Sequence, residues 1–94
     1  MQPCVYILAT RRNGTFYVGV TSDVTRRVWQ HRADVVDGFS QRYGVHKLVF
    51  VEFHDTMAEA ILREKRIKKW RRVWKIQLIE GANPTWRDLF DEIV

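Results

Sequence analysis

The chain of 94 residues has one cysteine, Cys4, which excludes an intrachain disulfide and a zinc cluster held by several thiolates. A chain without disulfides is typical of a reducing compartment, and we expect the cytoplasm. No apolar run approaches the roughly 18 residues that cross a membrane. The N-terminus also lacks the basic segment and apolar run of a secretory signal. The sequence therefore predicts a soluble cytoplasmic protein that does not associate with membranes.

The sequence also lacks internal repeats, low-complexity stretches and linkers, so we expect one domain over residues 1–94. The apolar content of 46% excludes a disordered chain, and the length is sufficient for a single core. Acidic residues are the minority, since 16 Lys and Arg against 11 Asp and Glu give a net charge of +5. Half of the cations fall between Arg63 and Lys75, which favours nucleic acid as a partner over an anionic membrane.

The first part of the chain predicts a β-hairpin. Two runs of β-formers, Val5–Leu8 and Thr15–Val18, flank a turn that contains Asn13-Gly14. An Asn-Gly pair supplies the positive φ angles that a tight hairpin turn requires. Gly19 follows the second run and is expected to break that strand.

A helix and a third strand are expected next. Thr21-Ser22-Asp23 predicts a helix start with a hydroxyl cap, and the apolar spacing continues to about Val35. Asp37-Gly38 ends this helix and begins a polar loop. The run from His46 to His54 is rich in β-formers and apolar on both faces at its centre, so we expect a covered strand rather than an exposed edge.

Three further helices complete the pattern. Thr56 and Glu59 form a capping box at the start of one helix, whose expected buried face is Met57, Ala60, Ile61 and Ile67. The next helix spans about residues 72–80 and stops at Gly81. A last short helix begins at Asn83-Pro84 and buries Trp86, Leu89 and Phe90. The order ββαβααα predicts an α+β fold, a small three-stranded antiparallel sheet flanked by helices.

Five side chains form the candidate site for phosphodiester hydrolysis: Tyr6, Tyr17, Arg27, His31 and Glu64. This reaction requires a cation beside the phosphate, a base for water and support for the leaving oxygen. Arg27 offers a forked guanidinium, and Glu64 can hold Mg²⁺, which prefers one or two carboxylates. A tyrosine acts as a base only where neighbouring cations stabilise its phenolate, because its reference pKa is about 10.

Each of these residues also has a purely structural interpretation. Strand tyrosines usually belong to the core, and a helical arginine or histidine is usually solvated or bonded to the backbone. Glu64 falls in the middle of the apolar stripe of its helix, where an unpaired carboxylate costs several kcal/mol. It is therefore either bound to a metal ion or paired with Lys68 or Arg27.

Four pieces in order resemble the GIY-YIG nuclease family. Val5-Tyr6-Ile7 and Tyr17-Val18-Gly19 resemble the two signature triplets, with Val5 at the position of the first Gly. The segment from Thr21 to His31 resembles the first helix of the family, and residues 59–64 resemble its metal-binding helix. The resemblance covers residues 5 to about 80, and the small size indicates the stand-alone, single-domain YhbQ-like group.

The resemblance implies a role for each residue. Tyr6 is the general base or orients the attacking water, and Tyr17 contacts the phosphate or shares the base role. Arg27 stabilises the phosphate in the transition state, His31 positions water or phosphate, and Glu64 binds a single divalent ion, Mg²⁺ or Mn²⁺. The asparagine that many members carry late in the domain is absent from residues 72–76, where Lys75 is an alternative phosphate contact.

The basic run interleaved with Trp70 and Trp74 has two interpretations. The cations can neutralise phosphates while a tryptophan stacks on an unpaired base. Alternatively, both tryptophans belong to the core and the cations form a solvated face. We favour core tryptophans together with cations that contact nucleic acid: Lys65, Lys68, Lys69, Arg71, Arg72 and Lys75.

The expected function is a metal-dependent endonuclease that nicks DNA, in repair or recombination, as a monomer or weak homodimer. Two alternatives remain open at this point. One is a non-catalytic nucleic-acid-binding module, and the other is an adaptor whose basic surface meets an acidic protein.

Overall fold

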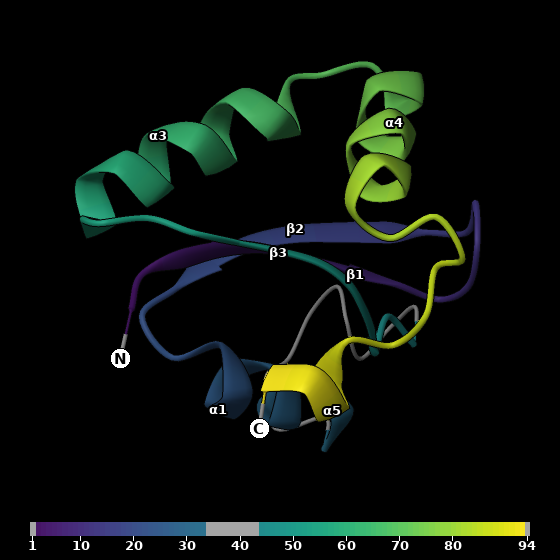
Figure 1. The fold of residues 1–94 in the computed structure, drawn as a ribbon, viewed down its shortest axis with the longest axis horizontal. Coiled ribbons are helices and arrows are strands. Elements are labelled where there is room, and N and C mark those ends of the chain that lie inside the picture. Colours follow the sequence, from purple (N-terminus) through teal and green to yellow (C-terminus); the bar gives the residue numbers. More distant parts are fainter. Residues whose placement is uncertain (1, 34–43, 94) are drawn as a thin grey trace.

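The computed structural model describes residues 2–33 and 44–93 of the chain. It confirms the predicted α+β class and the order ββαβααα, with a three-stranded antiparallel sheet between two layers of helices (Figure 1). Helices α3 and α4 cover one face of the sheet, and α1 and α5 cover the other. The elements are β1 (Cys4–Ala9), β2 (Phe16–Thr21), α1 (Val24–Arg32), β3 (Lys47–Phe53), α3 (Met57–Lys68), α4 (Arg72–Ala82) and α5 (Phe90–Ile93).

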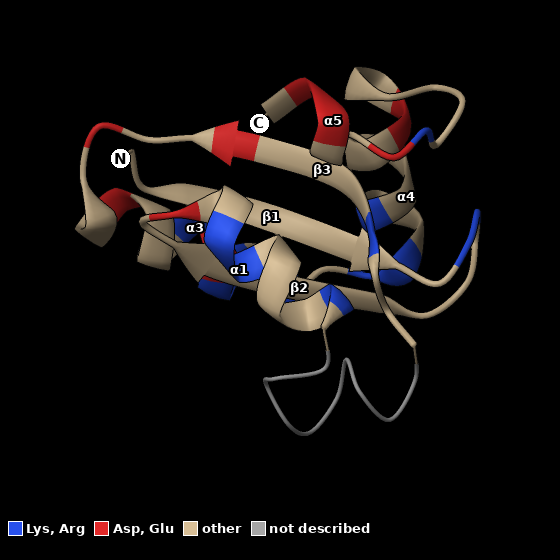
Figure 2. Ribbon diagram, turned by 90° about the horizontal axis from the view of Figure 1, so that it is seen from below, with Lys and Arg blue, Asp and Glu red and all other residues tan. Residues whose placement is uncertain are grey.

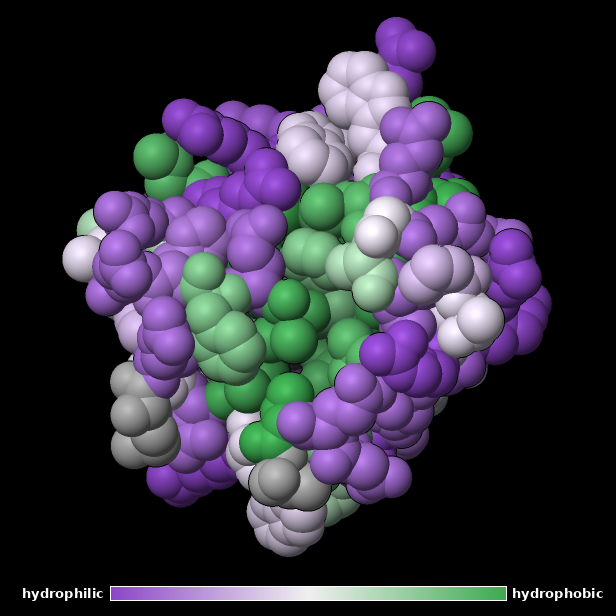
Figure 3. Space-filling view, in the orientation of Figure 1, coloured by the Kyte–Doolittle hydropathy of each residue, from purple (hydrophilic) through white to green (hydrophobic). Residues whose placement is uncertain are grey.

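Strand β1 is the centre of the sheet, in the order β2-β1-β3, and all six of its residues are buried. Side chains alternate along a strand, so β1 contributes to two cores. Val5, Ile7 and Ala9 pack with residues of α3 and α4, whereas Cys4, Tyr6 and Leu8 pack with residues of α1. Apolar side chains between the two helical layers are visible in the middle of the face in Figure 3. Tyr6 is thus directed towards α1.

Strand β3 lies at one edge of the sheet, and the expectation of a covered strand rather than an exposed edge is confirmed. Its central residues are buried, because helices cover both faces and the C-terminal segment covers the outer edge. The backbone N–H of Leu89 donates to Leu48 O at 2.8 Å, and Nδ2 of Asn83 donates to Val49 O at 3.1 Å. A bulge in the pairing with β1 leaves Val49 without a partner on that strand. Its carbonyl is therefore available to Asn83.

The hairpin differs from the expectation at two points. Strand β2 does not break at Gly19 but continues to Thr21, and Gly19 pairs with Tyr6 of β1. The connection spans residues 10–15, where Asn13 has a φ of +57° but Gly14 does not have a positive φ. The turn is consequently longer than the two-residue turn for which Asn-Gly is the usual signal.

The N-terminal caps of α1 and α3 follow from local sequence. Asp23, rather than a hydroxyl residue, caps α1, and its carboxylate accepts from Arg26 N at 3.2 Å. The cap of α3 is Thr56, whose hydroxyl accepts from Glu59 N at 3.2 Å, as predicted. The expected end of the first helix near Val35 and the loop from Asp37 lie outside the described residues.

The C-terminal segment departs most from the expectation. Gly81 lies within α4 instead of ending it, and residues 84–85 form a turn rather than a helix start. Trp86 is fully buried as predicted, but it adopts a φ of +56°, and helix resumes only at Phe90. Leu89 and Phe90 are only partly buried.

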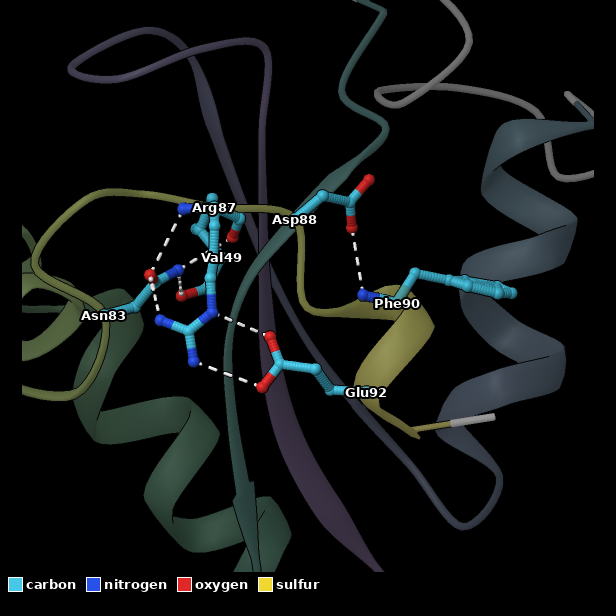
Figure 4. Close-up of polar contacts among 6 residues, drawn as sticks. All are labelled: Val49, Asn83, Arg87, Asp88, Phe90 and Glu92. Atoms are coloured by element: carbon cyan, nitrogen blue, oxygen red, sulfur yellow. Dashed lines mark hydrogen bonds and ion pairs between the residues drawn. The ribbon is translucent and has the colours of Figure 1, made fainter.

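Asn83 organises this segment (Figure 4). Its side chain is fully buried, with Nδ2 donating to Val49 O at 3.1 Å and to Arg87 O at 2.8 Å. Oδ1 accepts from Arg87 N at 3.1 Å. Buried polar groups need such partners, and one side chain here replaces the backbone bonds of a regular helix. Within the described part of the chain, no helix is long and apolar enough to span a membrane.

Candidate active site

Three aromatic side chains meet on the α1 face of the sheet. The hydroxyl of Tyr6 lies 3.1 Å from Nε2 of His31 in a buried hydrogen bond. The rings of Tyr17 and His31 are 4.9 Å apart, and those of Tyr6 and Tyr17 are 6.1 Å apart, measured between centroids. The two signature tyrosines and the helical histidine, well separated in sequence, therefore form one cluster.

Gly19 makes room for this cluster. A Cβ at Gly19 would lie 2.4 Å from both Cζ and the hydroxyl oxygen of Tyr6. Real side chains do not approach so closely, so any other residue here would displace the Tyr6 ring from His31. The sequence alone suggested a strand break at this glycine, whereas its actual contribution is the space for a ring on the adjacent strand.

Burial governs the protonation of Tyr6. The residue is only 1% exposed, and this burial raises the pKa of its hydroxyl well above the ordinary value. The neighbouring Tyr17, including a hydrogen bond with it, raises that pKa further, whereas the Arg27 guanidinium acts in the opposite direction. Tyr6 is therefore protonated at neutral pH, and Arg27 does not stabilise the phenolate enough for a free base.

His31 is buried as well, with 2% exposure. Burial lowers its pKa, and electrostatic interactions with Arg27 and His46 lower that pKa further. Its Nδ1 has no hydrogen-bond partner among the described residues. The ring is thus neutral at neutral pH, and Nε2 can exchange a proton with the Tyr6 hydroxyl.

Arg27 and Tyr17 bring the cluster to the surface. Both are partly exposed, in contrast to the two buried residues behind them. Arg27 lines an open hollow of about 340 Å³ between the end of β2 and α1, together with Thr21, Ser22 and Gln30. A forked guanidinium beside such a hollow can bind a phosphate.

Glu64 lies apart from this cluster. It is on α3, which packs against β1 and β2 on the face opposite to α1 (Figure 1). Its side chain is 13% exposed and forms an ion pair with Lys68 Nζ at 2.9 Å. This pair matches one of the alternatives that the sequence left open for Glu64.

Ala60 and Ile67 form the buried face of α3 as expected, but Ile61 is 37% exposed, so that part of the expectation is wrong.

The residues around Glu64 fit only a loosely held ion. No group of three potential ligands of the His, Cys, Asp or Glu type occurs among the residues that the structure describes. One carboxylate is sufficient for Mg²⁺, which keeps most of its water and takes further oxygens from a substrate phosphate. Glu64 could therefore hold such an ion once Lys68 moves away.

The candidate nucleic-acid-binding cations differ in their engagement. Lys65, Lys69 and Arg71 are exposed, and Lys68 pairs with Glu64. Lys75 Nζ lies 3.4 Å from Lys68 O, and Arg72 donates to carbonyls of the hairpin turn.

The two tryptophans of the basic run are more exposed than expected. Trp74 is 48% exposed and Trp70 only partly buried, so the expectation that both are core residues is wrong for Trp74.

A second ionic cluster on the α3 face was not anticipated from the sequence. Glu52 of β3 accepts from Arg63 Nε at 3.0 Å and from His54 Nε2 at 2.8 Å. The guanidinium of Arg63 also lies 5.1 Å from the centre of the Trp70 ring. This arrangement joins α3 to the edge strand and takes Arg63 out of the exposed basic surface.

The fold and the pair of tyrosines together define a GIY-YIG catalytic domain, and the model of that family matches residues 2–77. The chain belongs to the GIY-YIG family, a family of nucleases, and the resemblance seen in the sequence is confirmed. It is 36% identical to a UPF0213 protein of Clostridium perfringens over 79 residues, which are 84% of each chain. It is 37% identical to a UPF0213 protein of Halobacterium salinarum over 71 residues, which are 76% of this chain and 91% of that one.

A solved structure supports the same assignment. The NMR structure of the UPF0213 protein BH0048 from Bacillus halodurans superposes with a TM-score of 0.58 at 28% identity. The superposition covers 94% of this chain and 93% of that one. These similar proteins are of comparable length, as the prediction of a stand-alone group requires.

Proposed function

We propose that the protein is a divalent-metal-dependent endonuclease that nicks DNA by hydrolysing a phosphodiester bond. The observation that carries the proposal is the buried hydrogen bond between Tyr6 and His31 behind the partly exposed Tyr17 and Arg27. Membership of a nuclease family supports the reaction class. The metal ion, the DNA substrate and a role in repair or recombination are parts of the proposal.

The exposed and buried members of the cluster have different tasks. Arg27 binds the scissile phosphate and stabilises the charge that grows on its oxygens. Tyr17, which is hydrogen-bonded to Tyr6, contacts the phosphate or the attacking water. Tyr6 accepts the proton of the water through Tyr17 while its own proton moves to Nε2 of His31. The neutral His31 thus serves as the final acceptor, and no free phenolate is required.

Glu64 is the proposed metal ligand, and a bound Mg²⁺ or Mn²⁺ would neutralise charge on the phosphate and the leaving oxygen. Because α1 and α3 cover opposite faces of the sheet, a phosphate that meets both Arg27 and Glu64 must lie along the outer edge of β2. The exposed cations Lys65, Lys69 and Arg71 would then bind the neighbouring strand phosphates.

A second candidate function is a non-catalytic nucleic-acid-binding module. The ion pair between Glu64 and Lys68 favours it, because this pair occupies the one carboxylate proposed for the metal ion. The two candidates share the basic surface and differ only in turnover.

Cleavage of labelled duplex, single strand, flap and four-way junction, each with Mg²⁺, Mn²⁺ or EDTA, tests the proposal. We expect metal-dependent nicks from the wild type that disappear in Glu64→Gln and decrease by at least tenfold in Arg27→Gln. The matched control is Glu59→Gln, which removes an exposed carboxylate from the same helix and should cleave normally.

Two results would contradict the proposal, the first its enzymatic activity and the second its metal ligand. Binding without cleavage on every substrate would favour the binding module. Cleavage that persists undiminished in Glu64→Gln would exclude Glu64 as the metal ligand.

A further inference from the structure

A cleft separate from the tyrosine cluster lies between the β1–β2 turn and α4. Its volume is about 520 Å³, and it is lined by the turn backbone and by Arg11, Phe16, Arg72 and Lys75. The cationic residues of the turn and of the start of α4 gather at the same end of the molecule in Figure 2. No carboxylate lines the cleft among the described residues, so its charge is uniformly positive.

Arg72 lines the cleft and is held in place by contacts with the hairpin. Its guanidinium lies 4.1 Å from the centre of the Phe16 ring, and Nη2 donates to Asn13 O at 2.6 Å and to Gly14 O. An arginine has five N–H donors, of which these bonds use two. The N–H groups on Nε and Nη1 have no acceptor among the residues that the structure describes. A fork that is fixed on one side and free on the other can bind an oxyanion without losing much side-chain entropy.

Two more cations converge on this fork. Lys75 lies one turn further along α4, and the only bond of its Nζ in the described structure is a long one of 3.4 Å to Lys68 O. Arg11, in the β1–β2 turn, also lines the cleft and is exposed. Glu80, the acidic residue of α4, is already engaged by Arg12 at 3.3 Å and by Trp86 Nε1 at 2.8 Å. Among the described residues, none of the three cations of the cleft is paired with a carboxylate.

The N-terminus of α4 adds to the positive electrostatic potential of the cleft. Helix α4 begins at Arg72, and Arg71 at the cap position makes no side-chain capping bond. The first N–H groups of a helix and its dipole both favour an anion. This effect adds to the three side chains and does not replace them.

We propose that this cleft is a phosphate-binding subsite for a nucleic-acid strand, outside the catalytic cluster. The forked guanidinium with a lysine beside it matches a phosphodiester group, for which Arg and Lys are the usual partners. Because the subsite lies at the tip of the hairpin, it would hold a phosphate of the strand other than the scissile one. The inference rests on the proposed nucleic-acid partner but not on catalysis.

The test measures binding of a labelled oligonucleotide, single-stranded or duplex, in EDTA, with Arg11→Gln and Lys75→Gln. Arg72 is left intact because it also supports the turn. Each variant should lower the affinity three- to tenfold and reduce the slope of log Kd against log salt by about 0.7 for a single strand or 0.9 for a duplex. Lys47→Gln is the matched control, since it removes one cation from β3 outside the cleft.

NMR titration of the ¹⁵N-labelled protein locates the contact. Addition of the oligonucleotide should shift the amides of Gly14, Arg72 and Lys75, and the subsite variants should weaken these shifts. If inorganic phosphate saturates the same amides below 1 mM while both variants bind the oligonucleotide normally, the ligand is a free phosphate and the strand assignment is wrong. Equal losses in Lys47→Gln, or no shifts with either ligand, would also overturn the proposal.

The outcome is independent of the endonuclease assignment. Altered salt slopes without any cleavage would support the subsite and contradict the enzyme. Glu64-dependent cleavage with unchanged slopes in both subsite variants would support the enzyme and contradict the subsite.

Discussion

Gly19 faces Tyr6 across the β1–β2 pair, and a Cβ on this glycine would lie 2.4 Å from the Tyr6 hydroxyl oxygen. Tyr6 is 1% exposed and bonded to His31, so its ring can make room for a larger residue only by giving up this position. The glycine is therefore as much a part of the candidate site as the residues that carry its chemistry.

Gly19→Ala should destabilise the fold by about 1–3 kcal/mol, the usual cost of overpacking a core. It should also abolish cleavage, because the Tyr6 ring must move away from His31. Urea unfolding and the cleavage assay measure the two effects. Gly81→Ala is the control, since no atom lies within 4 Å of a Cβ at that position. This variant should raise the free energy of unfolding by up to about 1 kcal/mol. If the stability of Gly19→Ala were unaltered, the Tyr6 ring would have relaxed at no cost, which would contradict the prediction.

His31 should make stability depend on pH. Its pKa in the folded protein is lowered by burial, so the unfolded chain binds a proton more readily. The stability that the neutral His31 contributes to the fold is therefore fully present above the unfolded pKa of about 6.5. As the pH falls below this value, the free energy of unfolding decreases by at most about 1.4 kcal/mol per pH unit.

Urea unfolding of wild type and His31→Gln at pH 7, 6 and 5 measures this difference. The other histidines are common to both proteins and cancel in the comparison. The wild type should lose more stability than the variant as the pH decreases, and parallel curves would exclude a lowered pKa at His31.

Removal of Lys68 should strengthen metal binding. Lys68 Nζ lies 2.9 Å from Glu64 Oε2 and competes for the carboxylate. We expect Lys68→Met to bind Mn²⁺ three- to tenfold more tightly in a calorimetric or EPR titration without nucleic acid. Lys65→Met removes the same charge from an exposed position on the same helix and should change the affinity less. Equal effects would indicate only a general electrostatic contribution, and binding that survives Glu64→Gln would exclude the site.

Asn83 should be essential for docking the C-terminal segment. Asn83→Asp keeps the shape but directs a carboxylate oxygen at Val49 O and Arg87 O, the carbonyls that accept from Nδ2. The substitution removes one buried and one partly buried hydrogen bond and leaves both carbonyls without this donor, which should lower the free energy of unfolding by about 3 kcal/mol. Hydrogen exchange at the amide of Leu89, which donates to Leu48 O, should accelerate. Asn13→Asp, at an exposed turn position, should change stability by less than about 0.5 kcal/mol, and a similar loss there would contradict the assignment.

Local patterns were sufficient for most elements because their causes lie within one turn or one hairpin. The Thr56 cap, the strands on either side of Asn13 and the pair between Glu64 and Lys68 each depend on residues close in sequence. Long-range packing decided the rest. The expected helix at Pro84 gave way to a turn because buried Trp86 and Asn83 bind elsewhere in the fold. The edge position of β3 was likewise concealed, since burial by helices makes an edge strand resemble a central one.

The sequence by itself determined the family and the α+β order, and it supplied the residues of the candidate site, because motifs and periodicity are properties of the chain. Only the tertiary structure decided that Tyr6 and His31 are buried together while Tyr17 and Arg27 reach the surface. It also decided that Glu64 lies on the helix of the opposite face, and that Arg11, Arg72 and Lys75 share one cleft. The physical reason is that burial sets pKa and availability, and burial arises from contacts between segments far apart in the sequence.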